Sequence, residues 1–358
     1  MKFRKKLSMF LAVSALLVGV VGCGNNGGNT ANTPGGSGGE SAPANTGTAA
    51  ETEGKTYKIA ISQYVEHPSL DATREGFMAA LKDAGLVENE NLKVDYNNAQ
   101  ADSTNNMSIA QKIAGEKYDL VLAIATPPAI AVASQVKESP ILFAAVTDPL
   151  DAKLVDNLEK PGGNISGASD TNPEAISKLM DFIAANFKDV KNVGVIMNQG
   201  EPNAVVMTGL AEKALEKHGI KLVKASVTNT SEVKQAAESL VGRVDAIYIT
   251  LDNTVVEAVN TVIQVANEHD LPFFSSDRDT VENGAFATVG FKYYDHGYQV
   301  GQMAVEALKN GKKVGDMKVT VPDKLDVIMN LKAASEQGIE VTDAMKDQVQ
   351  DKENNIIE

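Results

Sequence analysis

The chain has 358 residues with a formal net charge of −14, one cysteine, four histidines and no tryptophan. This acidic balance argues against a nucleic-acid partner, because phosphate backbones require a basic protein face. The histidines are scattered, and no HExxH, CxxC or His-rich loop accompanies them. We therefore expect neither a metal site nor a cofactor.

The first 22 residues have the layout of a secretory signal peptide. Basic residues within Lys2–Lys6 precede an apolar run, Leu7–Val21, that is too short to span a bilayer comfortably as a permanent helix. The run leads into Val20–Cys23, which resembles the box that lipoprotein signal peptidase cleaves. The resemblance implies cleavage before Cys23 and lipid on its sulfur, and the alternative is a plain signal peptide with an incidental cysteine. Cys23 has no disulfide partner within the chain, because it is the only cysteine.

Residues 23–55 are predicted to form a disordered tether. Gly, Asn, Ser, Thr, Ala and Pro predominate there, and such a composition buries too little apolar surface to offset the entropy of ordering. A tether of this length spans about 30 Å. With lipid at its start, it would hold a globular body outside the cytoplasm and close to the cell membrane.

From residue 56 onward, short apolar runs alternate with amphipathic stretches. The expected strands of the first half are Tyr57–Ser62, Leu92–Asn97, Leu120–Ala125, Ile141–Val146 and Asn164–Ala168. After Asn172-Pro173 the pattern restarts, with strands at Asn192–Met197, Lys221–Val227, Ala246–Thr250, Pro272–Ser275 and Ala285–Val289, and helices at 203–218, 231–242 and 253–268. Strands that are apolar on both faces are typical of parallel sheets covered by helices on both sides.

Two successive arrays of this kind predict an α/β protein with two doubly wound parallel-sheet lobes joined by a hinge. We expect the N-terminal lobe to comprise residues 56–170 with a return segment at 294–320. The C-terminal lobe then comprises residues 171–293 with 321–345. A third part, Tyr294–Leu308 followed by strands near Val319–Val321 and Leu325–Met329, is expected to recross between the lobes. Three crossings of this kind are the pattern of type I periplasmic binding proteins.

The ligand of such a protein is expected beyond the carboxyl ends of the strands, in the cleft between the lobes. Hydroxyl, amide and carboxylate side chains gather at these strand ends, and at helix starts they can bind the two charges of an amino-acid zwitterion. The candidate ligand-binding residues are Ser62, Gln63, Tyr64, Thr126, Thr147, Asp148, Asn198, Glu201, Asn203, Asp252, Asn253 and Asp277.

A simpler interpretation applies to each of these residues, because Ser, Thr, Asp and Asn are the usual helix N-caps and need no ligand. Thr147-Asp148-Pro149 could form a plain turn. Tyr64 is expected to be a cleft aromatic, whereas His67, in a polar loop before Pro68, is expected to be exposed. Stacking against a ring would depend on Tyr64, Phe291, Tyr293 or Tyr294.

Six motifs in order resemble the tryptophan/tyrosine-type ABC transporter substrate-binding lipoproteins. They lie between Tyr57 and Leu331 and include Ile61-Ser62-Gln63 with Glu66-His67-Pro68, Asp71 with Arg74-Glu75-Gly76-Phe77, Ala123–Pro127, Val146–Pro149, Lys160–Asn164 and Thr250–Thr254. The resemblance implies the type I fold, a separately encoded permease and ATPase as partners, and an aromatic amino acid such as tryptophan or tyrosine as ligand.

Other solutes and other classes of protein remain as alternatives. The same fold serves branched-chain amino acids, nucleosides and sugars, although few aromatics are present to stack on a sugar ring. An enzyme is not expected, because the sequence contains no nucleophile elbow, P-loop or dinucleotide fingerprint. A transcriptional regulator would need a basic helix-turn-helix where the expected tether lies.

Overall fold

The structure is a computed structural model that describes residues 54–322 and 325–358. The expected signal peptide, the lipid attachment at Cys23 and nearly all of the expected tether lie outside the described residues. Among the described helices, none combines the length and the apolar character that a bilayer crossing requires.

The first lobe is built on a parallel five-stranded sheet in the order β2-β1-β3-β4-β5. Its strands are β1 (Tyr57–Gln63), β2 (Leu92–Asn98), β3 (Leu120–Ile124), β4 (Ile141–Val146) and β5 (Ile165–Ser169). Four helices cover it: α1 (Pro68–Asp83), α2 (Ser103–Ala114), α3 (Thr126–Gln135) and α10 (Tyr293–Leu308), with a short 3₁₀ turn, η2 (Val314–Asp316), nearby.

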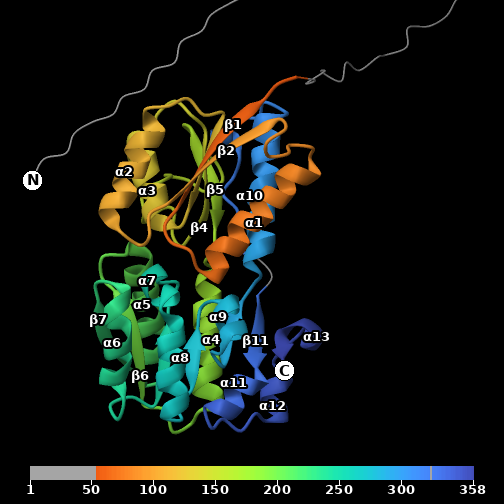
Figure 1. Cartoon of the computed structure of the whole chain (residues 1–358). Coiled ribbons are helices and arrows are strands. Elements are labelled where there is room, and N and C mark those ends of the chain that lie inside the picture. Colours follow the sequence, from red (N-terminus) through yellow and green to blue (C-terminus); the bar gives the residue numbers. More distant parts are fainter. Residues whose placement is uncertain (1–53, 323–324) are drawn as a thin grey trace, which may run out of the picture. The chain divides into compact units, whose positions relative to one another are not determined.

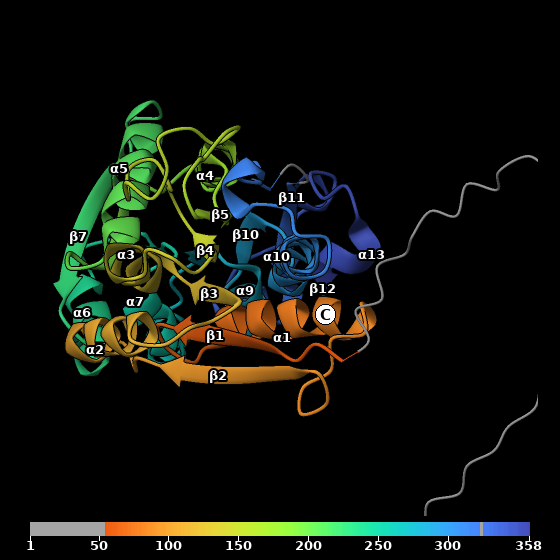
Figure 2. The same ribbon diagram turned by 90° about the horizontal axis from the view of Figure 1, so that it is seen from above.

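Alternate strand residues place these helices on opposite faces of the first sheet. Ile59 and Leu120 pack in one core cluster with residues of α1 and α10, whereas Ala60 and Val121 pack in another with residues of α2 and α3. Figure 1 and Figure 2 show the two pairs of helices on either side of the strands. This two-sided burial explains why these strands are continuous apolar runs.

The second lobe is built on a seven-stranded sheet in the order β12-β11-β10-β9-β8-β6-β7, parallel except where β10 meets β11. Its strands are β6 (Asn192–Asn198), β7 (Lys221–Val227), β8 (Ala246–Ile249), β9 (Phe273–Ser275), β10 (Ala287–Gly290), β11 (Asp326–Asn330) and β12 (Ile356–Ile357). Its helices are α4 (Pro173–Asn186), α5 (Pro202–Glu216), α6 (Val233–Leu240), α7 (Asn253–Glu257), α8 (Val259–Glu268), α9 (Arg278–Asn283), α11 (Leu331–Glu336), α12 (Asp343–Lys346) and α13 (Lys352–Asn355).

The chain passes between the lobes after β5, after β10 and before β11. The second of these passages leads into α10, which packs on α1 and on β4 of the first lobe. The α/β class with two largely parallel sheets, one in each lobe, is therefore confirmed.

Three details of the expected elements are wrong. The helix expected at 231–242 starts with a 3₁₀ turn, η1 (Thr230–Glu232), and the helix expected at 253–268 is interrupted at Ala258. The strand expected near Val319–Val321 is a single bridge between Thr320 and Ala168, because Pro322 follows and has no N–H to extend the ladder. The short elements after residue 331 have no clear periodicity and were not expected.

Helices α1 and α10 approach each other through glycine. A Cβ on Gly297 would lie 1.9 Å from the carbonyl oxygen of Thr73, and a Cβ on Gly76 would lie 2.0 Å from that of Tyr294. A Cβ on Gly301 would lie 2.6 Å from the carbonyl oxygen of Phe77. The two backbones are therefore in contact, which docks the returning helix firmly on the first lobe.

Candidate functional site

Two adjoining cavities lie between the lobes, at the carboxyl ends of their strands. We call them the polar cavity and the apolar cavity. Asp170 and Leu251 line both, so they mark the point where the cavities meet. The polar cavity is lined by His67, Ser69, Leu70, Ala145, Thr147, Asp170, Asn203, Leu251, Asn253, Val256, Asp277 and Tyr293. The apolar cavity is lined by Asp170, Thr171, Asn172, Ala175, Ile176, Leu179, Met207, Leu251, Ser276, Val289, Gly290, Phe291 and Leu325.

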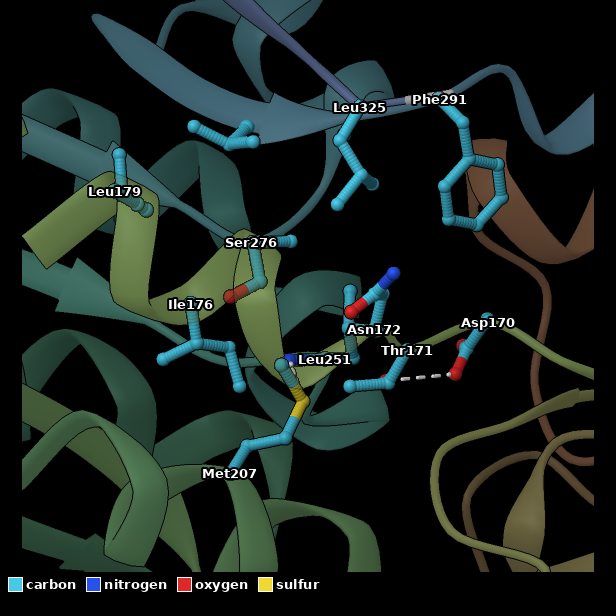
Figure 3. Close-up of a pocket in the computed structure, with 13 residues that line it drawn as sticks. Asp170, Thr171, Asn172, Ile176, Leu179, Met207, Leu251, Ser276, Phe291 and Leu325 are labelled. Carbon is cyan, nitrogen blue, oxygen red and sulfur yellow. Dashed lines mark hydrogen bonds between the residues drawn. The ribbon is translucent and has the colours of Figure 1, made fainter. Parts of the chain in front are cut away.

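The apolar cavity presents large aliphatic, sulfur-containing and aromatic side chains from several elements (Figure 3). Ile176 and Leu179 come from one turn of α4, and Met207 comes from α5. Phe291 and Leu325 come from two of the three connections between the lobes. Such a lining favours an apolar or aromatic group.

The polar cavity lies at the start of α1. The N-cap residue of this helix, His67, makes no side-chain hydrogen bond to the first turn, and Pro68 follows it. Ser69 and Leu70, in the first turn of α1, line the cavity. Because the first N–H groups of a helix have no partner within the helix, this end of the cavity suits a carboxylate.

Two buried carboxyl groups lie on the other side of the polar cavity. Asp277 accepts hydrogen bonds from the Ser69 hydroxyl at 2.5 Å, the Asp279 N–H at 2.8 Å and Thr280 Oγ1 at 3.3 Å. Asp170 accepts two hydrogen bonds from side chains, from Thr171 Oγ1 at 3.1 Å and from the Tyr293 hydroxyl at 3.2 Å. Asp170 therefore keeps more acceptor capacity for a cationic ligand group.

Burial raises the pKa of both carboxyl groups. The pKa of Asp170 rises from 3.8 to about 6, because desolvation outweighs the hydrogen bonds from Thr171 and Tyr293. Desolvation also raises the pKa of Asp277, against the hydrogen bond from Ser69. A ligand ammonium group would compensate for this unfavourable burial of negative charge.

Two buried polar atoms at the polar cavity have no hydrogen-bond partner among the described residues: His67 Nδ1 and Asn203 Oδ1. His67 was expected to be exposed, but it is 7% exposed, because the second lobe covers it and Asn253 Oδ1 lies 3.5 Å from its Nε2. Desolvation lowers the pKa of His67, which favours the neutral ring. These two atoms therefore keep hydrogen-bonding capacity that a water molecule or a ligand can fill.

The structure brings four of the twelve candidate ligand-binding residues together around the polar cavity: Thr147, Asn203, Asn253 and Asp277. They come from both lobes, after β4, at the start of α5, at the start of α7 and before α9. The other eight line neither cavity: Ser62, Gln63, Tyr64, Thr126, Asp148, Asn198, Glu201 and Asp252.

Several of these eight residues form hydrogen bonds to residues that line the cavity or to segments beside it. Glu201 is 1% exposed and accepts hydrogen bonds from the side-chain amides of Asn203, at 3.0 Å, and Asn253, at 2.6 Å. Asp252 caps α7 and also accepts the Asn198 N–H at 2.5 Å. Thr126 Oγ1 accepts the Thr147 N–H at 3.3 Å. These contacts hold the cavity residues in place.

The remaining candidates serve their own lobe. Asp148 accepts the N–H groups of Leu150 and Asp151, which is the plain turn considered for it. The Gln63 amide bonds Val65 and Asp71, and Asn198 accepts the Gly200 N–H. Ser62 is buried in β1. Tyr64 was expected to be a cleft aromatic, but it packs in the core of the first lobe and donates to the carbonyl oxygen of Ala101.

The end of β4 holds an unusual backbone conformation beside the polar cavity. Ala145 has a φ of +54°, in the region that favours glycine. The N–H of Ala145 donates a hydrogen bond of 3.0 Å to Nε2 of His296, which is a residue of α10. Burial lowers the pKa of His296 to about 4, so this nitrogen is free to accept. The returning helix thus fixes the strand end that presents Ala145 and Thr147.

Sequence reasoning missed Asp170 and Ser69, and it named Tyr293 only as a possible stacking ring. Asp170 follows β5 directly, so the strand-end rule applied to the other strands would have found it. Among the described residues, no cluster of three or more His, Cys, Asp or Glu side chains has the geometry of a metal site.

A polar cavity lined from both α/β lobes, adjoined by an apolar cavity lined by the second lobe and the connections, defines a binding protein of the type I periplasmic class. The chain belongs to the family of ABC transporter substrate-binding proteins, whose profile matches residues 58–352. Substrate-binding proteins of this kind are extracytoplasmic.

Three relatives show the extent of the similarity. The chain is 38% identical over 330 residues to a tyrosine-binding protein of Clostridioides difficile, covering 92% of this chain and 91% of that protein. A structure of the ABC domain from Streptococcus pneumoniae in complex with L-Trp has a TM-score of 0.78 at 31% identity, covering 85% of this chain and 100% of the other. The ligand-free, open structure of a substrate-binding protein with adhesive properties from Clostridium difficile has a TM-score of 0.61 at 39% identity, covering 84% and 98%.

The order of these two structures by TM-score is the reverse of their order by sequence identity. The L-Trp complex is the less similar of the two in sequence but superimposes better on this chain. The lobes of this structure therefore stand nearer to the arrangement in the ligand-bound relative than to the open one.

Proposed function

We propose that this protein is the solute-binding subunit of an ABC importer and captures an aromatic L-amino acid, tyrosine or tryptophan, between its two lobes. The observation that carries the proposal is the pairing of a polar and an apolar cavity that meet at Asp170. An aromatic amino acid has the same division, with a zwitterionic head and an apolar ring joined at one carbon. The relatives that are described as binding tyrosine or holding L-Trp support this choice.

In the proposed complex, each end of the polar cavity binds one charge of the zwitterion. The α-carboxylate faces the free N–H groups in the first turn of α1 and the hydroxyl group of Thr147. The ammonium group faces Asp170, with Asn203 Oδ1 as a further acceptor. The ring then enters the apolar cavity between Phe291 and Met207.

We propose that binding is coupled to hinge closure. Side chains of opposite lobes already touch in this structure, as at Ser69 with Asp277 and His67 with Asn253. The volumes open to the centre of a water molecule are about 20 Å³ in the apolar cavity and about 10 Å³ in the polar cavity. These volumes suit single water molecules, so the lobes must separate to admit an amino acid and then close around it. The solute stabilises the closed form because it contacts both lobes only there.

Isothermal titration calorimetry of the full chain against the twenty amino acids tests the proposal. We expect heat of binding with tyrosine or tryptophan and none with aspartate, lysine or glycine, because these cannot fill the apolar cavity. Binding of leucine, isoleucine or valine alone would transfer the assignment to branched-chain amino acids. Silence from all three aromatic amino acids would remove it.

We also propose that Cys23 carries lipid and that a permease and an ATPase accept the solute. The proposal rests on the lone cysteine at the end of the apolar leader and on the family of the chain. A Cys23→Ser variant is expected to be released from the membrane fraction of producing cells, because it has no sulfur to acylate. Retention of this variant in the membrane, with the same yield as the wild type, would contradict the lipid anchor.

A further inference from the structure

Two side chains with hydroxyl groups line the apolar cavity: Thr171, directly after Asp170, and Ser276, in the second lobe. Ser276 follows β9 and lines the cavity (Figure 3). Its Oγ lies 2.6 Å from the hydroxyl of Tyr248, which is fully buried in β8. Burial raises the pKa of Tyr248, so its hydroxyl stays protonated and neutral. A polar pair is therefore built into a region whose other side chains are mostly aliphatic or aromatic.

Asp170 is assigned to the ligand ammonium group, and the uncharged polar side chains of this cavity other than Ser276 have partners of their own. Thr171 Oγ1 donates to Asp170 at 3.1 Å. Asn172 caps α4 by accepting the Glu174 N–H at 3.0 Å, and it donates to the carbonyl oxygen of Pro322 at 3.1 Å. Ser276 has Tyr248 as its partner and keeps further hydrogen-bonding capacity, because a hydroxyl has one donor and two acceptor positions.

We infer that Ser276, held in place by Tyr248, hydrogen-bonds the polar atom of the ligand ring and so favours tyrosine and tryptophan over phenylalanine. This inference rests on the proposed function, because it assumes that an aromatic side chain enters the apolar cavity. When Tyr248 donates to Ser276, the serine proton is free for the phenol oxygen of a tyrosine ligand. When Ser276 donates to Tyr248, its lone pairs can accept the indole N–H or the phenol O–H.

The expected selectivity is moderate. A net hydrogen bond of about 1 kcal/mol corresponds to a preference of about fivefold. The preference is not larger, because Ser276 and Tyr248 satisfy each other when phenylalanine is bound, so no buried hydroxyl is left without a partner.

Dissociation constants for tyrosine, tryptophan and phenylalanine, measured by calorimetry on the full chain, test the inference. The wild type is expected to bind tyrosine or tryptophan about fivefold more tightly than phenylalanine. In Ser276→Ala this preference is expected to vanish, with phenylalanine affinity within about twofold of the wild type. Tyr248→Phe, which keeps the ring and removes the anchoring hydroxyl, is expected to lose part of the preference. Ser226→Ala, an exposed hydroxyl on β7 that accepts from Gln199, serves as a control with no change.

Two results would overturn the inference while leaving the proposed function intact. One is a wild type that binds phenylalanine as tightly as tyrosine and tryptophan. The other is a Ser276→Ala variant that keeps the wild-type preference or weakens all three ligands equally. A wild type that binds none of the three refutes the proposed function itself.

Discussion

An Asp170→Asn variant is expected to bind its amino acid about a hundredfold more weakly than the wild type at pH 7.5. The neutral amide cannot form the charge-assisted hydrogen bond with the ligand ammonium that we assign to the Asp170 carboxylate, and losing one partner of a buried charged pair costs about 2–5 kcal/mol. Calorimetry with tyrosine and tryptophan measures the change. Asp189→Asn removes an exposed carboxylate outside the site and is expected to bind normally.

The affinity of the wild type is also expected to depend on pH through Asp170. Its pKa is about 6 without ligand, and the ammonium needs the ionised form. Affinity therefore weakens as pH falls through 6 and approaches a loss of about tenfold per pH unit below it. The Asp170→Asn variant should show a flatter profile between pH 7 and pH 5. A variant with wild-type affinity, or one whose profile falls just as steeply, would show that the ammonium binds elsewhere.

The same substitution is expected to make the protein more stable at neutral pH. The folded-state pKa of Asp170 lies above the unfolded value of 3.8, so the folded state binds more protons between pH 3.8 and about 6. The contribution of Asp170 to the free energy of unfolding is therefore most favourable below pH 3.8. It falls by up to about 3 kcal/mol as the pH rises through 6. The neutral amide of the Asp170→Asn variant would not carry this penalty, and urea unfolding at pH 7.5 should show the gain. Functional residues often lower the stability of the folded protein in this way.

A Gly297→Ala variant is expected to lose about 3 kcal/mol in free energy of unfolding, or to fail to fold. The added Cβ would lie 1.9 Å from the carbonyl oxygen of Thr73, so the backbones of α1 and α10 would have to move apart. This separation would also shift His296, which holds the end of β4 beside the polar cavity. Urea unfolding measures the loss, and calorimetry on the folded fraction should show weaker ligand binding.

Gly209→Ala provides a matched control on α5. Apart from the adjacent backbone of α5 itself, no heavy atom lies within 4 Å of a Cβ built there, so alanine is expected to be neutral or to stabilise the helix by up to about 1 kcal/mol. Equal effects of the two alanine substitutions would contradict the close packing of α1 and α10. A stable Gly297→Ala variant with normal ligand binding would contradict it as well.

Sequence patterns predict the lobes well because burial on both faces of a parallel sheet requires continuous apolar runs, which are visible in the sequence. The runs at Ile141–Val146 and Lys221–Val227 coincide with β4 and β7 to the residue. Short elements such as α12 and α13 have no such signal, because four residues do not complete a periodic pattern. The break at Ala258 depends on the local helix geometry and has no glycine or proline to mark it.

The candidate site was harder to predict than the fold, because adjacent residues at one strand end have different roles. Asp252 turns inward to cap α7, whereas its neighbour Asn253 lines the polar cavity. Both are polar residues at a helix start, so residue type does not distinguish them. The burial of His67 depends on contact with the other lobe, at Asn253, which lies 186 residues away in sequence and which no local pattern records.

All three connections between the lobes contribute to the cavity walls. Asp170 belongs to the first, Phe291 to the second and Leu325 precedes the strand reached by the third. In the proposed complex, the bound molecule therefore rests against the connections that would bend on closure. We expect the size of the solute to set the angle between the two lobes in the closed form. A solute of the wrong size would leave the lobes at a different angle, and the proposed permease would not accept that form.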